Sequence, residues 1–151
     1  MGTVVEVQLR DVLASDLPLH FEHQSDPESA RLSATTRHDR AAFEAHWTRI
    51  LGDSTSVVQT IVADGEVAGS AFCWVQDGKR EVGYRIGQEH WGKGIATGAL
   101  SQLLVEVGER PLYATVAAHN PASRRVLEKC GFRQVDVERD GELTLDVMRL
   151  D

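Results

Sequence analysis

Apolar positions along the chain follow a helical period in some segments and a strand period in others. The clearest early helix is predicted over residues 39–51, and Gly52 is a natural end for it. Its apolar side chains follow the i, i+3, i+4, i+7, i+8 spacing of a core-facing stripe: Phe43, His46, Trp47, Ile50 and Leu51. We therefore interpret His46 and Trp47 as core or substrate-wall residues. A strand is expected over 4–9 and a less marked helical stretch over 14–24.

Three Asp-Gly pairs mark sharp turns between segments rich in β-branched and aromatic residues: Asp64-Gly65, Asp77-Gly78 and Asp140-Gly141. Asp-Gly is a strong hairpin signal because a type I′ turn requires positive φ at both central positions. The pattern predicts an antiparallel meander of strands 57–63, 66–75 and 80–86. It also predicts a final hairpin of strands 132–139 and 142–149.

Two further helices, over 94–108 and 121–130, are separated by a predicted strand over 112–116. A strand, a helix and a strand in close succession imply a right-handed parallel crossover. The expected order is β-α-α-β-β-β-α-β-α-β-β. We predict a mixed α/β (α+β) fold in which helices lie on both faces of a mainly antiparallel sheet. No repeat or linker divides the chain, so residues 1–151 are expected to form a single domain.

Composition narrows the classes of protein that the chain can belong to. A chain of 151 residues with 42% apolar and 26% charged residues suits one soluble core. The net charge of −7 argues against nucleic acid as a partner, because neutralising phosphates needs a basic face. We expect no membrane span, no signal peptide and a cytoplasmic location. Cys73 and Cys130 suggest neither a metal site nor a disulfide framework, and we expect reduced thiols in or near the core.

The segment Glu89 to Thr97 lies between a predicted strand and an amphipathic helix. Its Gly92-x-Gly94 pattern lets the backbone approach a ligand closely, and the free amides of a first helical turn suit an anion such as a pyrophosphate. Taken alone, this pattern is equally typical of a plain strand-to-helix turn. It is neither a Walker loop nor a dinucleotide fingerprint, because Ala96-Thr97 follows where those motifs need other residues.

The segment His119 to Phe132 carries the marks of a well-defined helix: Asn120 as N-cap, Pro121 at the first helical position and Gly131 as a left-handed stop. These marks explain Asn120 without a ligand. They do not explain why Ser123 and two arginines fall near the expected anion site. Four cations lie beside the two segments, and each is also compatible with a solvated surface: Lys93, Arg124, Arg125 and Lys129.

Together the two segments resemble the GNAT (Gcn5-related N-acetyltransferase) superfamily, and within it the branch of ribosomal-protein alanine N-acetyltransferases. The resemblance rests on residues 82–86 and 89–97 in the first motif and on 120–123 and 128–132 in the second. The two motifs occur in this order and are separated by one helix and one strand. It implies an enzyme, an N-acetyltransferase that uses acetyl-CoA as co-substrate. The family commonly has Gln or Arg three residues before the first glycine, whereas this chain has Glu89.

The resemblance also implies a set of cofactor-binding residues. The pyrophosphate would be held by the backbone amides of Trp91, Gly92, Lys93, Gly94, Ile95, Ala96 and Thr97. The pantetheine arm would pair with the end of the strand at Tyr84, Arg85 and Ile86, and the side chain of Asn120 would reach the same arm. Ser123 would also lie at this site, and Arg125 or Lys129 would approach the phosphates of the cofactor.

Catalysis in such an enzyme is direct attack of a neutral amine on the thioester, which calls for an acid that reprotonates the leaving thiolate. Many members place a tyrosine on the last helix for this purpose. The matching position here is Leu127, which excludes tyrosine acid catalysis from that site. Ser123 matches a serine proposed for the same role in the ribosomal-protein branch and is the candidate acid. Its alternative role is to stabilise the start of the helix.

For the base, Glu81 lies on the strand before the glycines, where several members of the family carry a working glutamate. An exposed strand carboxylate beside Lys79 and Arg80 is the competing interpretation. A carboxylate that one ribosomal-protein group has on the next strand corresponds to Thr115, which cannot act as a base. A chain of water molecules is the remaining route for the proton.

The cost of deprotonation bears on the acceptor. Near pH 7.4, neutralising an α-amine with a pKa of ~7.8 costs about 0.5 kcal/mol, whereas a lysine amine at ~10.4 costs about 4 kcal/mol. A protein or peptide N-terminus is therefore favoured. A small amine such as a polyamine, an amino acid or an aminoglycoside is the alternative within enzymes, and a non-catalytic acyl-CoA-binding domain is the alternative outside them. For the oligomeric state, we expect a monomer or a homodimer.

Overall fold

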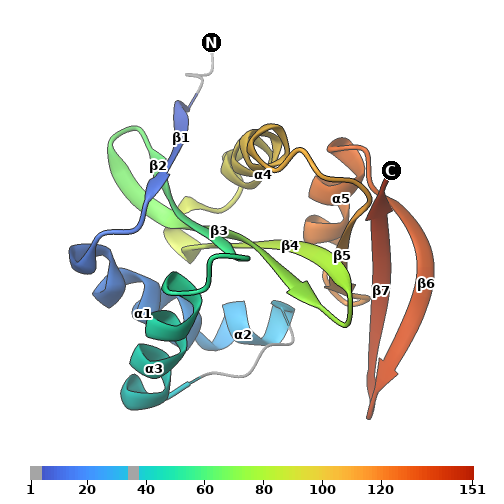
Figure 1. Cartoon of the computed structure of the whole chain (residues 1–151), viewed down its shortest axis with the longest axis horizontal. Helices are drawn as coiled ribbons and strands as arrows, with labels where there is room; N and C mark the ends of the chain where they lie inside the picture. The colour runs from blue at the N-terminus through green and yellow to red at the C-terminus, as the bar shows by residue number, and fades with distance from the viewer. Residues whose placement is uncertain (1–4, 34–37) are drawn as a thin grey trace.

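The computed structural model describes residues 5–33 and 38–151. Its strands form one seven-stranded sheet in the order β1-β2-β3-β4-β5-β7-β6 (Figure 1). The strands are β1 Val7–Asp11, β2 Val57–Ala63, β3 Glu66–Gln76, β4 Lys79–Ile86, β5 Leu112–Ala117, β6 Arg133–Asp140 and β7 Leu143–Leu150. Neighbouring strands are antiparallel except β4 and β5, which are parallel.

Helices cover both faces of this sheet. They are α1 Leu17–Ser25, α2 Pro27–Ser33, α3 Arg40–Leu51, α4 Ile95–Glu106 and α5 Pro121–Lys129, with short 3-10 turns at Ala14–Asp16 and Gln88–His90. Figure 1 shows α1, α2 and α3 on one side of the sheet and α4 and α5 on the other. The predicted mixed fold, with a mainly antiparallel sheet between helices, is confirmed.

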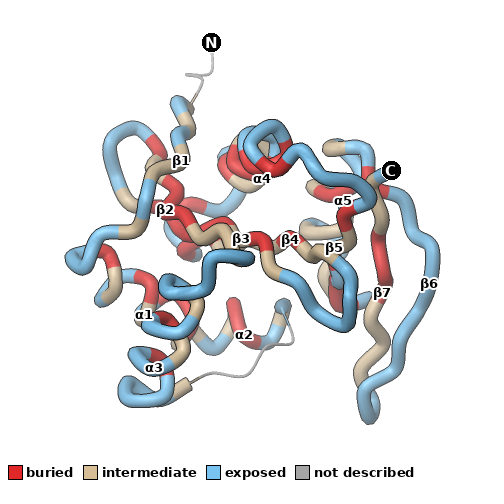
Figure 2. The backbone as a smooth tube through the Cα atoms, viewed as in Figure 1, coloured by how far each residue is buried: buried red, intermediate tan, exposed pale blue. Residues whose placement is uncertain are grey.

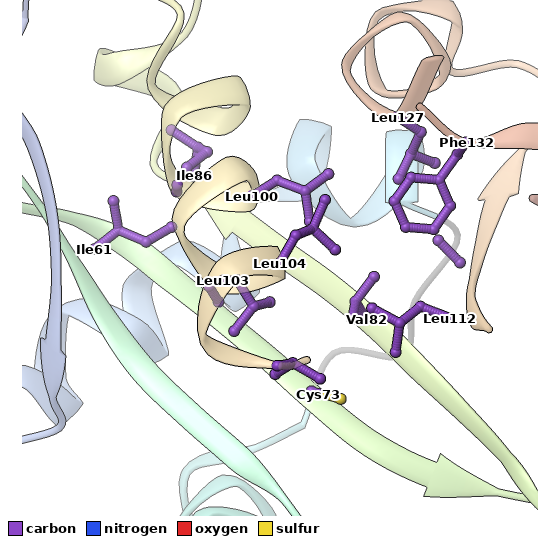
Figure 3. Close-up of a cluster of buried hydrophobic side chains, with 14 of the residues drawn as sticks. Ile61, Cys73, Val82, Ile86, Leu100, Leu103, Leu104, Leu112, Leu127 and Phe132 are labelled. Atoms are coloured by element: carbon purple, nitrogen blue, oxygen red, sulfur yellow. The ribbon is translucent and has the colours of Figure 1, made fainter. Parts of the chain in front are cut away.

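The main core lies between α4 and the sheet, as Figure 3 shows. Helix α4 has hydrophobic residues on the face that meets the strands, and Leu100 and Leu103 are fully buried there. Leu127 of α5 and Phe132 extend the same cluster toward β5 and β7. Figure 2 shows that burial is concentrated in α4 and the central strands, whereas the edge strand β6 is exposed throughout. This core fixes the start of α4 against the centre of the sheet.

Two of the three Asp-Gly turns have the predicted geometry. The φ angles are 48° and 83° at Asp64 and Gly65, and 52° and 76° at Asp77 and Gly78. The third prediction was wrong by one residue, because Asp140 pairs with Leu143 as part of β6. Positive φ therefore falls on Gly141. A glycine at the first central position is typical of a type II′ turn, which needs no left-handed aspartate.

Helix α2 was not predicted from the sequence. Its buried residues are Ser29 and Ala30, small side chains that produce no apolar stripe. The first strand covers Val7–Asp11 instead of 4–9, and residue 4 of the prediction lies outside the described residues. Over residues 5–33 and 38–151, we find no helix with both the length and the apolar character that a membrane span requires.

Candidate functional site

The sheet opens between its two parallel strands. Over the described residues, β4 and β5 pair at a single position, Glu81 with Tyr113, whereas β3 and β4 stay paired from Gly69 and Ile86 to Gln76 and Lys79. Beyond that position the C-terminal parts of β4 and β5 diverge. A cavity of about 460 Å³ lies at this opening, bordered by the end of β4, the start of α4, the start of α5 and α2. We call it the donor groove.

One end of the donor groove is formed by the loop that leads into α4. Gly92 and Gly94 both have φ of 76°, and a Cβ at either would meet no atom of the described residues within 4 Å apart from its own neighbours along the chain. The first hydrogen bond of α4 runs from Gly98 N to Gly94 O at 3.1 Å. The amides of residues 95–97 therefore have no acceptor within the helix, and the N-cap is a glycine without a side chain. This arrangement fits a pyrophosphate.

The loop is tied to the end of β4 by its tryptophan. Trp91 donates a hydrogen bond from Nε1 to the carbonyl oxygen of Ile86 at 2.9 Å. The amide of Gly87 donates to Ala68 O at 2.8 Å, which holds the preceding turn against β3. The glycine loop is thus fixed relative to the strand that forms the wall of the groove.

A hydroxyl pair lies at the start of α5. The phenol oxygen of Tyr84 and Oγ of Ser123 are 2.7 Å apart, and both residues line the donor groove. The cap of α5 is Asn120, whose Oδ1 accepts from the amide of Ser123 at 3.2 Å. The hydroxyl of Ser123 is directed to Tyr84 and is not the helix cap. Burial raises the pKa of Tyr84, so the phenol keeps its proton at neutral pH.

The groove collects most of the cofactor-binding residues predicted from the sequence: Tyr84, Arg85, Ile86, Trp91, Gly92, Gly94, Ile95, Ala96, Thr97, Asn120, Ser123 and Lys129. Lys93 and Arg125 are exposed and do not line it. Ser29, Leu32 and Ser33 were missed, because they belong to the unpredicted helix α2. His90 also lines the groove, and no sequence signal separated it from its neighbours.

Glu81 lies on β4 at the point where the sheet begins to open. Its Oε1 accepts a hydrogen bond from Oγ1 of Thr115 at 3.3 Å. Burial raises the pKa of this carboxyl, with the hydrogen bond from Thr115 acting in the opposite direction. Glu81 does not line the donor groove. Any proton that it takes from the reacting amine must therefore arrive through an intermediary such as water.

A second cavity, of about 570 Å³, lies on the face of the sheet that α1 and α3 cover. Residues from these helices and from β3 line it, His46 and Trp47 among them. Arg85 lines both this cavity and the donor groove. The two spaces therefore meet at the side chain of one residue on β4.

A sheet that opens at its parallel strands beside a helix start with free amides defines a class of acyltransferases that take the acyl group from a coenzyme A thioester. The model of the acetyltransferase (GNAT) domain family matches residues 6–133. The chain belongs to this family. The predictions of the superfamily, of an acyltransferase and of acetyl-CoA as co-substrate are confirmed.

Two relatives and one solved structure illustrate the similarity. The uncharacterized N-acetyltransferase p20 of Bacillus licheniformis is 31% identical over 147 residues, which are 89% of this chain and 83% of that protein. The putative ribosomal N-acetyltransferase YdaF of Bacillus subtilis is 31% identical over 102 residues, covering 63% of this chain and 56% of that protein. The predicted resemblance to the ribosomal branch agrees with this second similarity.

One structural neighbour is spermidine N-acetyltransferase from Vibrio cholerae, solved in complex with CoA and spermine. Its TM-score is 0.84, and the superposition covers 95% of this chain and 94% of that chain. At 18% sequence identity, this similarity shows the fold alone. The name of p20 gives no acceptor, and the names of YdaF and of the neighbour give different ones, so they do not select an acceptor for this chain.

Proposed function

We propose that this protein transfers the acetyl group of acetyl-CoA to a primary amine, namely the α-amine of a protein or peptide N-terminus. The observation that carries the proposal is the donor groove. There the glycine loop, the open side of β4 and the Tyr84–Ser123 pair face one space. Such a space offers sites for a phosphate anion, an extended amide arm and a thiolate along one line.

The residues present fit the donor. Amides of residues 92–97 would hold the pyrophosphate, aided by the positive end of the α4 dipole. Backbone groups of β4 from Tyr84 to Ile86 lie beside the opening and would pair with the pantetheine arm. The side chains of Asn120 and Lys129 line the same groove, and Lys129 would supply a positive charge to the phosphates.

The reaction needs two proton movements in addition to the exchange of bonds. A C–N bond forms between the amine and the acetyl carbon, the C–S bond breaks, and the thiolate requires a proton. Ser123 is the proposed proton donor to the sulfur. The Tyr84 phenol would return a proton to Ser123 through their hydrogen bond, and solvent water would reprotonate the phenol as CoA leaves. The hydrogen bond between Tyr84 and Ser123 supports Tyr84 as the second member of this proposed relay.

The base is the less demanding part of the mechanism if the acceptor is an α-amine. Deprotonating such an amine near neutral pH costs about 0.5 kcal/mol, as opposed to about 4 kcal/mol for a lysine side chain. Glu81, acting through water, is the proposed receiver of this proton. Its raised pKa makes it a better proton acceptor than an ordinary carboxylate.

A thiol-release assay tests the proposal directly. The acceptors are peptides with a free N-terminus, the same peptides with a blocked N-terminus and a free lysine, and a set of small amines including spermidine. We expect CoA release with the free N-termini and little with the blocked peptides. Preference for spermidine would refute the peptide acceptor. Binding of acetyl-CoA without transfer to any amine would indicate a non-catalytic binding domain.

Three further predictions from the sequence stand beside this proposal. We expect residues 1–151 to act as one domain, the protein to be cytoplasmic, and the assembly to be a monomer or a homodimer. Size-exclusion chromatography with light scattering would test the last of these.

A further inference from the structure

The second cavity is walled by aromatic rings that come from two sides. On the helical side, His20 of α1 stacks on Trp47 of α3 with ring centroids 4.8 Å apart and planes 10° apart. Phe43 lies 5.5 Å from the same tryptophan. On the sheet side, Phe72 and Trp74 of β3 are 5.4 Å apart. All five side chains line the cavity.

The ring of Phe72, on β3, packs against β4, the strand that borders the donor groove. A Cβ built at Gly83 of β4 would stand 2.6 Å from the ring of Phe72. The ring therefore occupies the space that a side chain at residue 83 would need. Gly83 precedes Tyr84, so the aromatic wall reaches the strand position next to the hydroxyl pair.

Burial keeps the ring of His20 uncharged, and the polar groups beside it fix the position of its ring proton. Asp16 is held as a carboxylate by Arg10, which lowers its pKa well below the usual range, and it accepts a hydrogen bond from Oγ1 of Thr60 at 2.8 Å. The hydroxyl proton of Thr60 is thus committed to Asp16. Thr60 must therefore accept from Nε2 of His20 at 3.1 Å, which places a ring proton on Nε2. Burial lowers the pKa of His20 to about 4.

The cavity offers little to a polycation. Among the described residues that line it, Asp53 is the one carboxylate. That carboxylate accepts three hydrogen bonds from its own turn: from Thr55 N at 2.9 Å, Thr55 Oγ1 at 2.7 Å and Ser56 Oγ at 3.0 Å. The formal charge at the end nearest the donor groove is the guanidinium of Arg85. Its charge is positive, like that of a polyamine.

We infer that this cavity is the acceptor site, and that it receives the apolar, preferably aromatic, side chain next to the primary amine that is acetylated. The inference rests on the proposed function and names its substrate class. A volume of about 570 Å³ lies in the range of small-molecule sites and accommodates one large side chain. Because Arg85 borders both spaces, an amine attached to a group in this cavity can be presented to the donor groove.

The test compares acceptors in the thiol-release assay with the full chain. Three tripeptides differ in their first residue, which is phenylalanine, alanine or lysine. Phenylalaninamide is a small molecule with the same primary amine and aromatic side chain, and spermidine represents a polycation. We expect kcat/KM for the phenylalanine peptide to exceed that for the alanine peptide about tenfold or more, because an additional ring is buried. Comparing the peptide with phenylalaninamide then separates a peptide acceptor from a small amine.

Two variants connect the preference to the cavity. Phe72→Ala and Trp74→Ala each remove a half-buried ring and should bring the phenylalanine-to-alanine ratio close to one, with acetyl-CoA affinity unchanged. Phe21→Ala is the matched control. Its ring packs edge-on against Phe43 at 5.2 Å but does not line the cavity, so the ratio should persist. A preference that survives in both cavity variants would overturn the inference, as would spermidine or the alanine peptide reacting best.

Calorimetry separates failure of this inference from failure of the proposed function. If no acceptor is acetylated, the proposed function fails. In that case, phenylalaninamide should still bind the CoA complex of the wild-type protein and lose that binding in Phe72→Ala. Absence of binding to the wild-type complex would refute the aromatic acceptor site itself.

Discussion

The hydroxyl of Ser123 forms a hydrogen bond with Tyr84, whereas the side chain of Asn120 caps the helix. Removing the Ser123 hydroxyl should therefore affect catalysis without affecting the stability of the helix. We predict that Ser123→Ala lowers kcat by roughly 10²-fold, because the lost group acts only in the transition state. The affinity for acetyl-CoA should change little. The melting temperature should stay close to that of the wild type, since the helix cap is untouched. Steady-state kinetics and thermal unfolding on one variant measure both effects.

The partner hydroxyl supplies the control for this prediction. If Tyr84 and Ser123 act as a relay, Tyr84→Phe should also reduce kcat, and the double variant should lose little more than the worse single variant. Ser123→Thr keeps a hydroxyl at the same position and should retain more activity than Ser123→Ala. A normal kcat in Ser123→Ala would remove this residue from the mechanism and leave the thiolate to water.

At the residue scale, the success of sequence-based prediction depended on how local each feature is. The glycine loop is contiguous in sequence, so a turn into a helix with free amides could be predicted there from neighbouring residues. The hydrogen bond between Tyr84 and Ser123 joins residues that lie 39 positions apart in the sequence, one on a strand and the other on a helix. No spacing rule connects such positions, because their distance depends on how the sheet opens.

At the scale of elements, the start of α4 is the feature on which donor binding depends. Gly94→Val places a branched side chain in the open space above the first helical turn and should reduce CoA affinity more than tenfold. Backbone strain is a separate effect, because a non-glycine residue at φ of 76° costs about 1–2 kcal/mol. Isothermal titration with CoA on the folded variant measures the loss of affinity.

Gly65→Val is the matched control. Gly65 has φ of 83° and open space at its Cβ position, but it lies in the β2–β3 hairpin, away from the donor groove. This variant should show a similar loss of stability with CoA affinity unchanged. Equal CoA affinity in Gly94→Val and the wild type would contradict the proposed role of the loop.

Elements with periodic apolar residues or strong turn signals could be predicted, and elements without them could not. Helix α3 was predicted because Phe43 and Trp47 mark its buried face. Helix α2 was missed because the side chains that it buries are small or polar, and with it the three residues that it contributes to the donor groove. Of the second cavity, the sequence indicated only His46 and Trp47, as core or substrate-wall residues on one helix. The rest could not be predicted, because the cavity is assembled from α1, α3 and β3.

At the scale of the whole molecule, the buried network around His20 makes stability depend on pH. The pKa of His20 is about 4 in the folded protein and about 6.5 when unfolded, so between these values the unfolded chain binds an extra proton. Stability should therefore fall by about 2 kcal/mol from pH 7 to pH 5 on account of this residue. Urea unfolding at the two pH values measures the loss, and His20→Phe should reduce it.

Acidification below pH 4 should remove further stability through Asp16. Its folded pKa is depressed by Arg10, so the contribution of this carboxylate is present above the unfolded pKa and is lost as the pH falls. A stability profile that is flat from pH 7 to pH 4 would contradict the neutral, buried state of His20.

Donor binding should stabilise the fold, because the groove joins β4 to α2 and to the starts of α4 and α5. A ligand present at a hundredfold excess over its dissociation constant adds about 2.7 kcal/mol to the free energy of unfolding. The melting temperature should therefore rise with the concentration of CoA. The absence of any shift at millimolar CoA, with no binding by calorimetry, would refute the donor groove.

The single pairing between β4 and β5 also affects how the enzyme releases its product. The diverging edge of β4 would bind the pantetheine arm, and the glycine loop would bind the phosphates. Both parts are identical in acetyl-CoA and in free CoA. Contacts of this kind lower the energy of reactant and product alike and do not favour the forward step. Free CoA should therefore compete with acetyl-CoA at comparable affinity, seen as competitive inhibition in initial-rate kinetics.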